Sequence, residues 1–352
     1  MEISPYKKLA QALDALPNGF PATKDGVELR LLEKLFTSED ASLACQLSTH
    51  LESAEEIAAR LGGNPAELRR QLKGMSRRGL IDAGRAENGL GYRLLPFVVG
   101  IYEMQVGSLD AELAQLVEAY FKDAFTNVLK VRPQFHRVIP VGESIRNSME
   151  IHPFESASGL VNAAQAWGVL DCICRKQKAL IGEACEHPLD VCMTIDQRPG
   201  AFDNSDIVRA VSREEALATL RRAADAGLVH SVSNTREGLH YICNCCTCSC
   251  GILRGMAELG IANVVARSAF VNRMDEALCN TCAACIDTCP FGDIRMESSL
   301  KVDDARCVGC GVCVLACPTD ALALVRRPEE EILPVPETLE DWGNWRTAAR
   351  SS

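Results

Sequence analysis

One cysteine motif occurs twice near the carboxyl-terminal end of the chain and limits what this region can fold into. Each copy reads Cys-x2-Cys-x2-Cys-x3-Cys-Pro, and the second copy repeats the first position for position. The eight cysteines are Cys279, Cys282, Cys285 and Cys289 in the first copy and Cys307, Cys310, Cys313 and Cys317 in the second. Three thiolates at this spacing let one tight loop surround a cluster of metal and sulfide ions, while the fourth thiolate comes from the other copy.

This crossed arrangement predicts two [4Fe-4S] clusters. The first is expected on Cys279, Cys282, Cys285 and Cys317, and the second on Cys307, Cys310, Cys313 and Cys289. Structural zinc sites use paired Cys-x2-Cys units separated by longer spacers, so the triple spacing argues against zinc here. Gly309 and Gly311 allow the second loop to approach its cluster closely, whereas the first loop has Asn280, Ala283 and Ala284 instead.

With this motif, the segment from Glu276 to Val325 resembles a bacterial-type two-cluster [4Fe-4S] ferredoxin. The resemblance implies a small α+β module with pseudo-two-fold symmetry that transfers single electrons at low potential. Eight acidic residues oppose three basic ones here, which predicts a basic docking surface on the redox partner. They are Asp275, Glu276, Asp287, Asp293, Glu297, Asp303, Asp304 and Asp320 against Arg295, Lys301 and Arg306.

A second set of nine cysteines lies upstream, between Cys172 and Cys250, and its density has no explanation in packing. The nine are Cys172, Cys174, Cys185, Cys192, Cys243, Cys245, Cys246, Cys248 and Cys250. Alternate residues of a strand face the same way, so we expect Cys172 to converge with Cys174, and Cys246 with Cys248 and Cys250. Such soft ligands favour one or two further iron–sulfur clusters, with a zinc site as the alternative.

The segment between these cysteines is expected to fold the two groups face to face. Ser212 is predicted to cap a helix that ends at Gly227, and residues 228–231 to return as a strand. His187, which precedes Pro188, is a candidate ligand, but a lone histidine in a loop is more often an exposed polar residue, and we favour that interpretation.

The chain of 352 residues and 47% hydrophobic content is long enough for two or three domains. Residues 1–20 contain no apolar run followed by a cleavage site, and the longest apolar run, residues 94–102, is too short to span a bilayer. We therefore expect a cytoplasmic protein whose 18 cysteines are metal ligands or free thiols rather than disulfides.

The amino-terminal part shows the pattern of a helix-turn-helix. Ser53 begins a capping box for a helix that runs to Leu61, Gly62 and Gly63 break it, and a second helix follows from Asn64 to about Arg78. A hairpin with Asn88-Gly89 at its turn comes next, and the whole is similar to a winged helix domain.

The second of these helices carries five basic residues, which permits contacts with DNA phosphates. They are Arg69, Arg70, Lys73, Arg77 and Arg78. Winged helices also mediate docking and dimerisation, and the net charge of −10 disfavours nucleic acid. We therefore expect association with a protein, as a homodimer or in a hetero-complex.

From Leu31 onward, the chain also resembles fused winged helix and 4Fe-4S binding proteins of anaerobic bacteria, which implies redox work in an anaerobic metabolism. The shared signatures are Pro-Phe-Val-Val-Gly-Ile-Tyr-Glu over residues 96–103, Cys-Ile-Cys-Arg over 172–175 and Ile-Cys-Asn-Cys-Cys over 242–246.

The predicted fold class is multidomain α+β. We expect an extension over residues 1–26, a winged helix domain over 27–99, a helical connector over 100–150, a cysteine-rich metal-binding domain over 151–271, a two-cluster ferredoxin domain over 272–326 and a tail over 327–352. In the tail, Trp342 and Trp345 lie on a predicted short helix and either dock onto a partner or pack back on the chain.

The sequence favours an electron-transfer protein or subunit that passes single electrons between a donor and a larger oxidoreductase. No acid–base pair, nucleotide-binding loop or flavin motif is recognisable, so no catalytic residue is predicted. Two alternatives remain. One is a winged helix regulator of transcription that senses redox state, and the other is an enzyme whose central cluster leaves one iron open to substrate.

Overall fold

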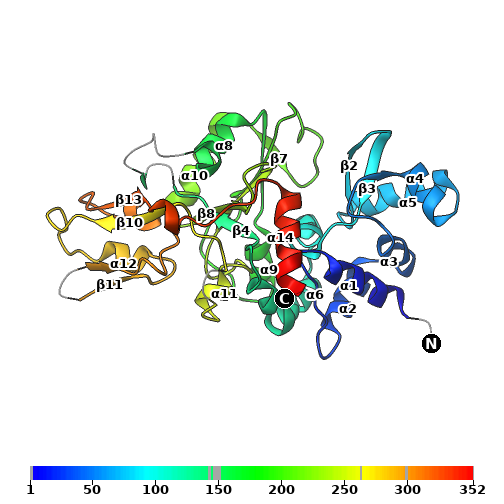
Figure 1. Ribbon diagram of the computed structural model, residues 1–352, viewed down its shortest axis with the longest axis horizontal. Helices are drawn as coiled ribbons and strands as arrows, with labels where there is room; N and C mark the ends of the chain where they lie inside the picture. Colours follow the sequence, from blue (N-terminus) through cyan, green and yellow to red (C-terminus); the bar gives the residue numbers. More distant parts are fainter. Residues whose placement is uncertain (1–2, 142–143, 146–151, 262–263, 298–299, 352) are drawn as a thin grey trace. The chain divides into compact units, whose positions relative to one another are not determined.

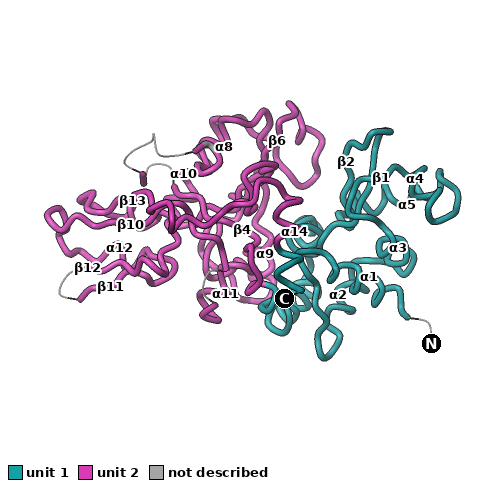
Figure 2. Tube along the Cα trace, in the orientation of Figure 1, with its two compact units in different colours: residues 1–128, 346–352 teal, residues 129–345 magenta. Residues whose placement is uncertain are grey.

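The computed structural model describes residues 3–141, 144–145, 152–261, 264–297 and 300–351. The chain divides into two compact units (Figure 2). Unit 1 comprises residues 1–128 and 346–352, and unit 2 comprises residues 129–345. Within the described ranges, no helix has the length and apolar character needed to cross a membrane.

Unit 1 begins with three helices and continues into a helix pair and a small antiparallel sheet (Figure 1). The elements are α1 Pro5–Ala15, α2 Val27–Leu35, α3 Ser38–Ala44, β1 Glu52–Ser53, α4 Ala54–Leu61, α5 Pro65–Arg77, β2 Asp82–Ala86 and β3 Gly89–Arg93. Strand β3 lies between β1 and β2, and the register of the hairpin runs from Asp82 opposite Arg93 to Ala86 opposite Gly89. The sequence pattern predicts a helix over about residues 41–51, but α3 begins at Ser38 and ends at Ala44.

The helix pair begins and ends where its sequence signals predict. The Ser53 hydroxyl accepts from the Glu56 N–H while the Glu56 carboxylate accepts from the Ser53 N–H, which completes the capping box of α4. Gly62 and Gly63 have positive φ values of 78° and 118° and end the helix. Asn64 then caps α5 by accepting from the Ala66 N–H.

The rest of unit 1 consists of η1 Phe97–Ile101, η2 Glu103–Gly107, α6 Ala111–Tyr120 and η3 Phe121–Phe125, the last continuing into α7 Thr126–Leu129. The apolar stripe over residues 110–130 predicts one long amphipathic helix. This helix is present, but the π-helical turn η3 interrupts it. Phe20 joins its buried face, with ring centroids 4.8 Å from both Phe97 and Tyr120.

Unit 2 is built on a six-stranded antiparallel sheet with the order β4-β8-β9-β6-β5-β7. The strands are β4 His136–Val138, β5 Ala166–Leu170, β6 Cys192–Asp196, β7 Arg209–Val211, β8 Val229–Ser233 and β9 Tyr241–Cys245. Helices α8 Ala157–Ala163 and α10 Arg213–Asp225 cover one face, where Val161, Leu220 and Ile242 belong to one apolar core. Helix α9 Ile173–Leu180 follows β5, and α11 Arg254–Ala257 follows β9.

Two predictions for this sheet have different outcomes. Ser212 caps α10 with a capping box, and β8 returns after Gly227, as predicted. From the sequence, residues 155–169 are also predicted to form a helix that leads into the cysteine-rich region. This prediction is wrong in its second half, because residues 166–170 form β5 between β6 and β7. Gly168 permits this close packing, since a Cβ there would lie 2.2 Å from Val208 Cγ1.

The carboxyl-terminal part of unit 2 contains two antiparallel strand pairs and two short helices. Strand β10 Phe270–Met274 pairs with β13 Leu322–Arg326, and β11 Ile294–Met296 pairs with β12 Leu300–Val302. Helix α12 Ala284–Thr288 and helix α13 Val312–Leu315 occupy equivalent places in the two copies of the cysteine motif. The short turn η7 Glu329–Glu331 leads toward the last helix, α14 Leu339–Ser351.

The two tryptophans of α14 have different environments. The Trp342 side chain is buried, donates from Nε1 to the Gln134 carbonyl at 2.8 Å and packs on Phe135. Trp345 remains 46% exposed. Of the two alternatives for this helix, packing back on the chain therefore applies to Trp342.

Replacing Trp342 with alanine should lower the free energy of unfolding by about 3–5 kcal/mol, because it removes a buried aromatic side chain and one of the hydrogen bonds that the Gln134 carbonyl accepts. Trp345→Ala is the matched control and should change it by less than about 1 kcal/mol. Urea unfolding followed by circular dichroism measures both. Equal effects of the two substitutions would contradict this assignment.

Candidate metal centres

The eight cysteines of the repeated motif line two cavities, four to each. Cys279, Cys282, Cys285 and Cys317 line a cavity with about 320 Å³ of space that includes open solvent. Cys289, Cys307, Cys310 and Cys313 line the other, of about 340 Å³ measured in the same way. The structure thus brings together the two crossed sets, three thiols from one copy with the fourth from the other.

The local fold explains how each copy contributes to both cavities. Cys285 lies on α12 and Cys289 ends that helix, so one short helix presents thiols to two different cavities. Cys313 on α13 and Cys317 after it do the same in the second copy. All four of these cysteines belong to the same apolar cluster as Ile294, Leu300 and Leu322, which places the cavities next to each other.

Backbone N–H groups donate to the sulfur that each copy gives to the other. Asp293 N–H donates to Cys289 Sγ at 3.4 Å, and Ala321 N–H donates to Cys317 Sγ at 3.2 Å. Burial opposes ionisation of Cys317, but bonds from Thr319 and the Ala321 and Leu322 N–H groups outweigh it, so its pKa lies below the ordinary value. These bonds suit a thiolate.

Burial opposes ionisation of the thiols that line the second cavity. Burial raises the pKa of Cys310 to about 12, and burial followed by the charge of neighbouring thiolates raises the pKa of Cys313 further. Asn272, itself buried, donates from Nδ2 to Cys313 Sγ at 3.2 Å. Thiols whose ionisation is so opposed become thiolates when a metal neutralises them. The donor set therefore fits a cationic metal centre.

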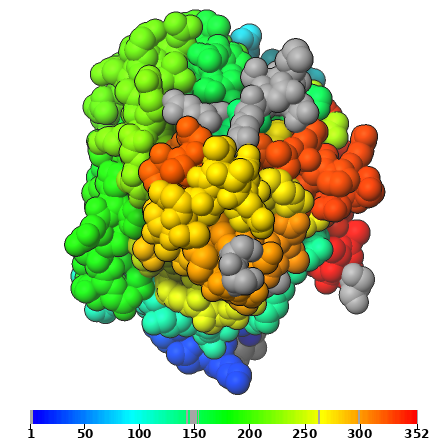
Figure 3. All heavy atoms as spheres, turned by 90° about the vertical axis from the view of Figure 1, so that its left-hand side faces the viewer, coloured from blue at the N-terminus to red at the C-terminus, as the bar shows by residue number. Residues whose placement is uncertain are grey.

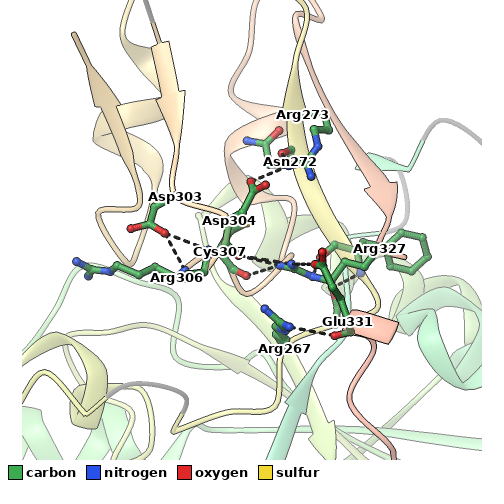
Figure 4. A network of polar contacts seen from close by, with 12 residues as sticks. Arg267, Asn272, Arg273, Asp303, Asp304, Arg306, Cys307, Arg327 and Glu331 are labelled. Carbon is green, nitrogen blue, oxygen red and sulfur yellow. Dashed lines mark hydrogen bonds and ion pairs between the residues drawn. The ribbon is translucent and has the colours of Figure 1, made fainter. Parts of the chain in front are cut away.

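A buried arginine fixes the loop of the second cavity (Figure 4). Arg327 is 3% exposed and donates from Nη2 to the Cys307 carbonyl at 2.8 Å and from Nε to the Phe270 carbonyl at 3.1 Å. Asp304, whose carbonyl also accepts from Arg327, pairs through its carboxylate with Arg273. The network ties this loop to β10 and places a guanidinium beside a candidate ligand.

The two cysteine loops adopt the same left-handed backbone conformation with different residues. Thr281 and Ala283 in the first loop and Gly309 and Gly311 in the second occupy equivalent positions and have φ between 57° and 81°. A Cβ on Gly309 would lie 2.1 Å from the Phe270 carbonyl oxygen, and one on Gly311 would lie 2.1 Å from Ser144 Oγ. Glycine is therefore required in the second loop by crowding as well as by φ.

Six of the nine central cysteines form one group of buried and half-buried thiols, which we call the six-cysteine group. Its members are Cys172, Cys174, Cys192, Cys243, Cys245 and Cys250. Cys172 shares hydrogen bonds with Cys174 and Cys192, and Cys250 shares them with Cys174 and Cys245. Hydrogen bonds from Cys174 and Cys192 outweigh burial and hold the pKa of Cys172 well below its usual value. The charge of Cys172 in turn helps raise the pKa values of Cys174 and Cys192.

Three segments supply this group. Cys172 caps α9 and Cys174 lies in its first turn, so the expectation that this pair belongs to a strand is wrong although the two thiols do meet. Cys243 and Cys245 alternate along β9 and therefore share a face, opposite Ile242 in the apolar core. Cys250 joins them rather than Cys246 and Cys248, because the chain leaves the strand after Cys245.

Arg175 lies beside this group and is 3% exposed. Its Nη1 donates to the Asn244 carbonyl at 3.1 Å and approaches Cys246 Sγ at 3.8 Å, while Nε and Nη2 have no hydrogen-bond partner among the described residues. A buried guanidinium nitrogen without a hydrogen-bond acceptor destabilises the fold. The arrangement of Arg175 Nε and Nη2 therefore fits an anionic group bound among the cysteines. The sequence signature containing Arg175 gave no indication of this role.

The remaining three central cysteines lie with His187. The donor atoms of Cys185, His187, Cys246 and Cys248 are all within 4.8 Å of one another. The interpretation of His187 as an isolated polar residue therefore does not match its surroundings. The signal available in the sequence was a pair of matched spacings, Cys185-x-His187 and Cys246-x-Cys248.

Comparison with protein families gives one match. Residues 300–323, which include all four cysteines of the second copy, match the 4Fe-4S binding domain family. No curated protein and no solved structure matches the chain. The match and the many cysteines indicate that the chain binds iron–sulfur clusters, a property typical of electron transfer.

Substituting Gly309 with alanine should reduce iron binding and lower the stability of this module by at least about 1–2 kcal/mol, because the new Cβ meets a backbone carbonyl at a left-handed φ. Ala283→Gly, at the other loop, should change stability by less than about 1 kcal/mol and leave iron unchanged. Iron analysis and urea unfolding under anaerobic conditions measure both. Normal iron content in Gly309→Ala would contradict the crowding argument.

Proposed function

We propose that this chain is an electron-transfer protein that passes single electrons at low potential between a donor and a larger oxidoreductase. The observation that carries the proposal is the sorting of eight cysteines into two adjoining cavities, each lined by three thiols of one motif copy and one of the other. Two [4Fe-4S] clusters, when bound there, would supply the one-electron chemistry.

In this function the chain's own residues hold and insulate the clusters. The backbone N–H groups of Asp293 and Ala321 stabilise negative charge on their ligands. Apolar side chains such as Leu300, Leu322 and Leu324 line the cavities and exclude water. The shared apolar cluster between the cavities supports electron passage from one to the other.

The surface of the module supports docking of a redox partner. Cys282 is exposed, so the first cavity opens near the surface, and Leu278 and Met296 are also exposed. In Figure 3 the yellow and orange atoms of this module face the viewer. Apolar contacts within an acidic surface suit a partner that presents basic residues around an apolar patch.

Cys289→Ala should damage the cluster bound by Cys307, Cys310 and Cys313 and spare the other, because Cys289 belongs to the crossed set. Cys317→Ala is the matched control and should show the reverse. Electron paramagnetic resonance of the reduced proteins distinguishes the two centres. Loss of the centre held by Cys279, Cys282 and Cys285 in Cys289→Ala would contradict the crossed assignment.

For the six-cysteine group, we propose a further iron–sulfur cluster. Two nitrogens of the buried Arg175 guanidinium, Nε and Nη2, have no hydrogen-bond partner in the described part of the chain, which supports a centre of net negative charge such as thiolates and sulfide provide. Zinc bound by four thiolates is the alternative, and it also carries negative charge. An enzyme with an open iron is less favoured, because six thiols exceed the four ligands that a cubane cluster requires.

For residues 27–99 of unit 1, we propose a winged helix domain that mediates association, most simply as a homodimer. The helix pair α4–α5 and the three-stranded sheet support the fold. Of the five basic residues, four lie on α5 and Arg78 is its C-cap. Two of the five are paired within the unit, Arg69 with Glu55 and Arg78 with Asp40. These pairs reduce the positive charge available to phosphates.

A redox-sensing regulator is the second candidate, and the exposure of all five basic residues on α5 and at its C-cap favours it.

If the domain mediates association, the protein should sediment as a dimer and bind duplex DNA more weakly than about 1 μM at physiological salt. Fluorescence anisotropy and analytical ultracentrifugation measure both properties. Tighter, sequence-specific and salt-sensitive binding that is lost in an Arg69→Glu, Arg70→Glu variant would promote the regulator instead.

A further inference from the structure

We propose that Cys185, His187, Cys246 and Cys248 form a closed tetrahedral site for one zinc ion, separate from any cluster in the six-cysteine group. The site is independent of the electron-transfer proposal, because zinc has no redox chemistry. It would be a structural clamp at the edge of the cysteine-rich region.

The spacing of the donor atoms carries this proposal. Zinc binds thiolate sulfur at about 2.3 Å and imidazole nitrogen at about 2.0–2.1 Å, so its tetrahedral ligands lie roughly 3.5–4 Å apart. The four donors here lie within 4.8 Å of one another. The four ligands of a [4Fe-4S] cluster bind four different irons and must therefore lie farther apart. Among the described residues, no other group of cysteines or histidines is this close, including those of the two ferredoxin cavities.

The donor set has the composition of a structural zinc site. Three thiolates and one imidazole form one of the usual four-coordinate combinations and leave no open position. Two segments supply them in pairs, Cys185 and His187 from the loop between α9 and β6, and Cys246 and Cys248 from the loop after β9. Ligand pairs on two loops far apart in the sequence join those loops through the ion.

Neighbouring residues hold the donors in place. Cys246 is buried with Val191 and Leu228, and Cys185 packs against the same apolar cluster. The Ser249 hydroxyl donates to Cys185 Sγ at 3.4 Å and lies 3.9 Å from Cys248 Sγ. Hydrogen bonds to metal-bound thiolates orient them and reduce their charge, so Ser249 is a positioning residue for this site.

The four ligands of the proposed zinc site lie next to residues of the six-cysteine group in the sequence. Cys246 immediately follows Cys245, and the loop from residues 181 to 191 connects Cys174 with Cys192. A zinc ion would fix both loops and thereby hold the segments that carry the six-cysteine group. Nine cysteines in one region therefore serve two centres of different chemistry.

The test uses the full chain, purified anaerobically, with zinc, iron and sulfide measured per chain. The wild-type protein should contain about one zinc, and X-ray absorption at the zinc edge should show three sulfur ligands and one nitrogen. A Cys185→Ser, His187→Ala variant should lose at least about four-fifths of the zinc, with sulfide retained. His50→Ala, at an exposed histidine of unit 1, is the matched control and should keep all three.

His187→Cys keeps the test informative if the double variant does not fold. This variant should still bind zinc, and its absorption spectrum should change to four sulfur ligands. An unchanged ligand set would show that His187 is not a ligand and overturn the proposal. Absence of zinc from the wild-type protein, or loss of sulfide together with zinc in the folded double variant, would also overturn it.

Discussion

Closely spaced buried thiols are the constraint on which unit 2 depends. A thiolate far from water needs a positive partner, and a row of thiols next to one another makes each further ionisation harder. Burial and neighbouring thiolates raise the pKa values of Cys310 and Cys313, and bonds with neighbouring thiols raise those of Cys174 and Cys192. Metal ions relieve this penalty, so the folded arrangement of these loops and their metal content are thermodynamically linked.

The ferredoxin-like module shows what sequence spacing can and cannot predict. The spacing led directly to the two four-cysteine sets that line the cavities, because ligand geometry restricts a short loop severely. The substitution of glycine by Thr281 and Ala283 in the first loop had no visible reason in the sequence. The structure supplies one, since the crowding by Phe270 and Ser144 that excludes a side chain occurs at Gly309 and Gly311. Such crowding depends on residues far away in the sequence.

The central region was less predictable because its cysteines follow no standard spacing. The predicted convergence of Cys246 with Cys248 is present, but Cys250 lies with Cys174 and Cys245 instead, because the strand has ended at Cys245 and alternation no longer applies. Residues 166–170 were mistaken for helix because an apolar run of this length fits either structure, and only pairing with β6 and β7 decides it. The roles of Arg175 and His187 could not be predicted from the sequence, because each residue contacts a partner 60 or more positions away.

The two ferredoxin cavities are not electrostatically equivalent, although the motif that forms them is repeated. Arg327 places a buried guanidinium against the carbonyl of Cys307, and Asn272 donates a hydrogen bond to Cys313. Both interactions favour negative charge on whatever the second set binds, and hydrogen bonds and local charge are the means by which proteins adjust cluster potentials. Cys282 of the first set is instead exposed, where water screens its charge. The two copies of the loop therefore lie in different electrostatic environments. Under the proposed electron-transfer function, this asymmetry would favour the reduced state at the second set of cysteines.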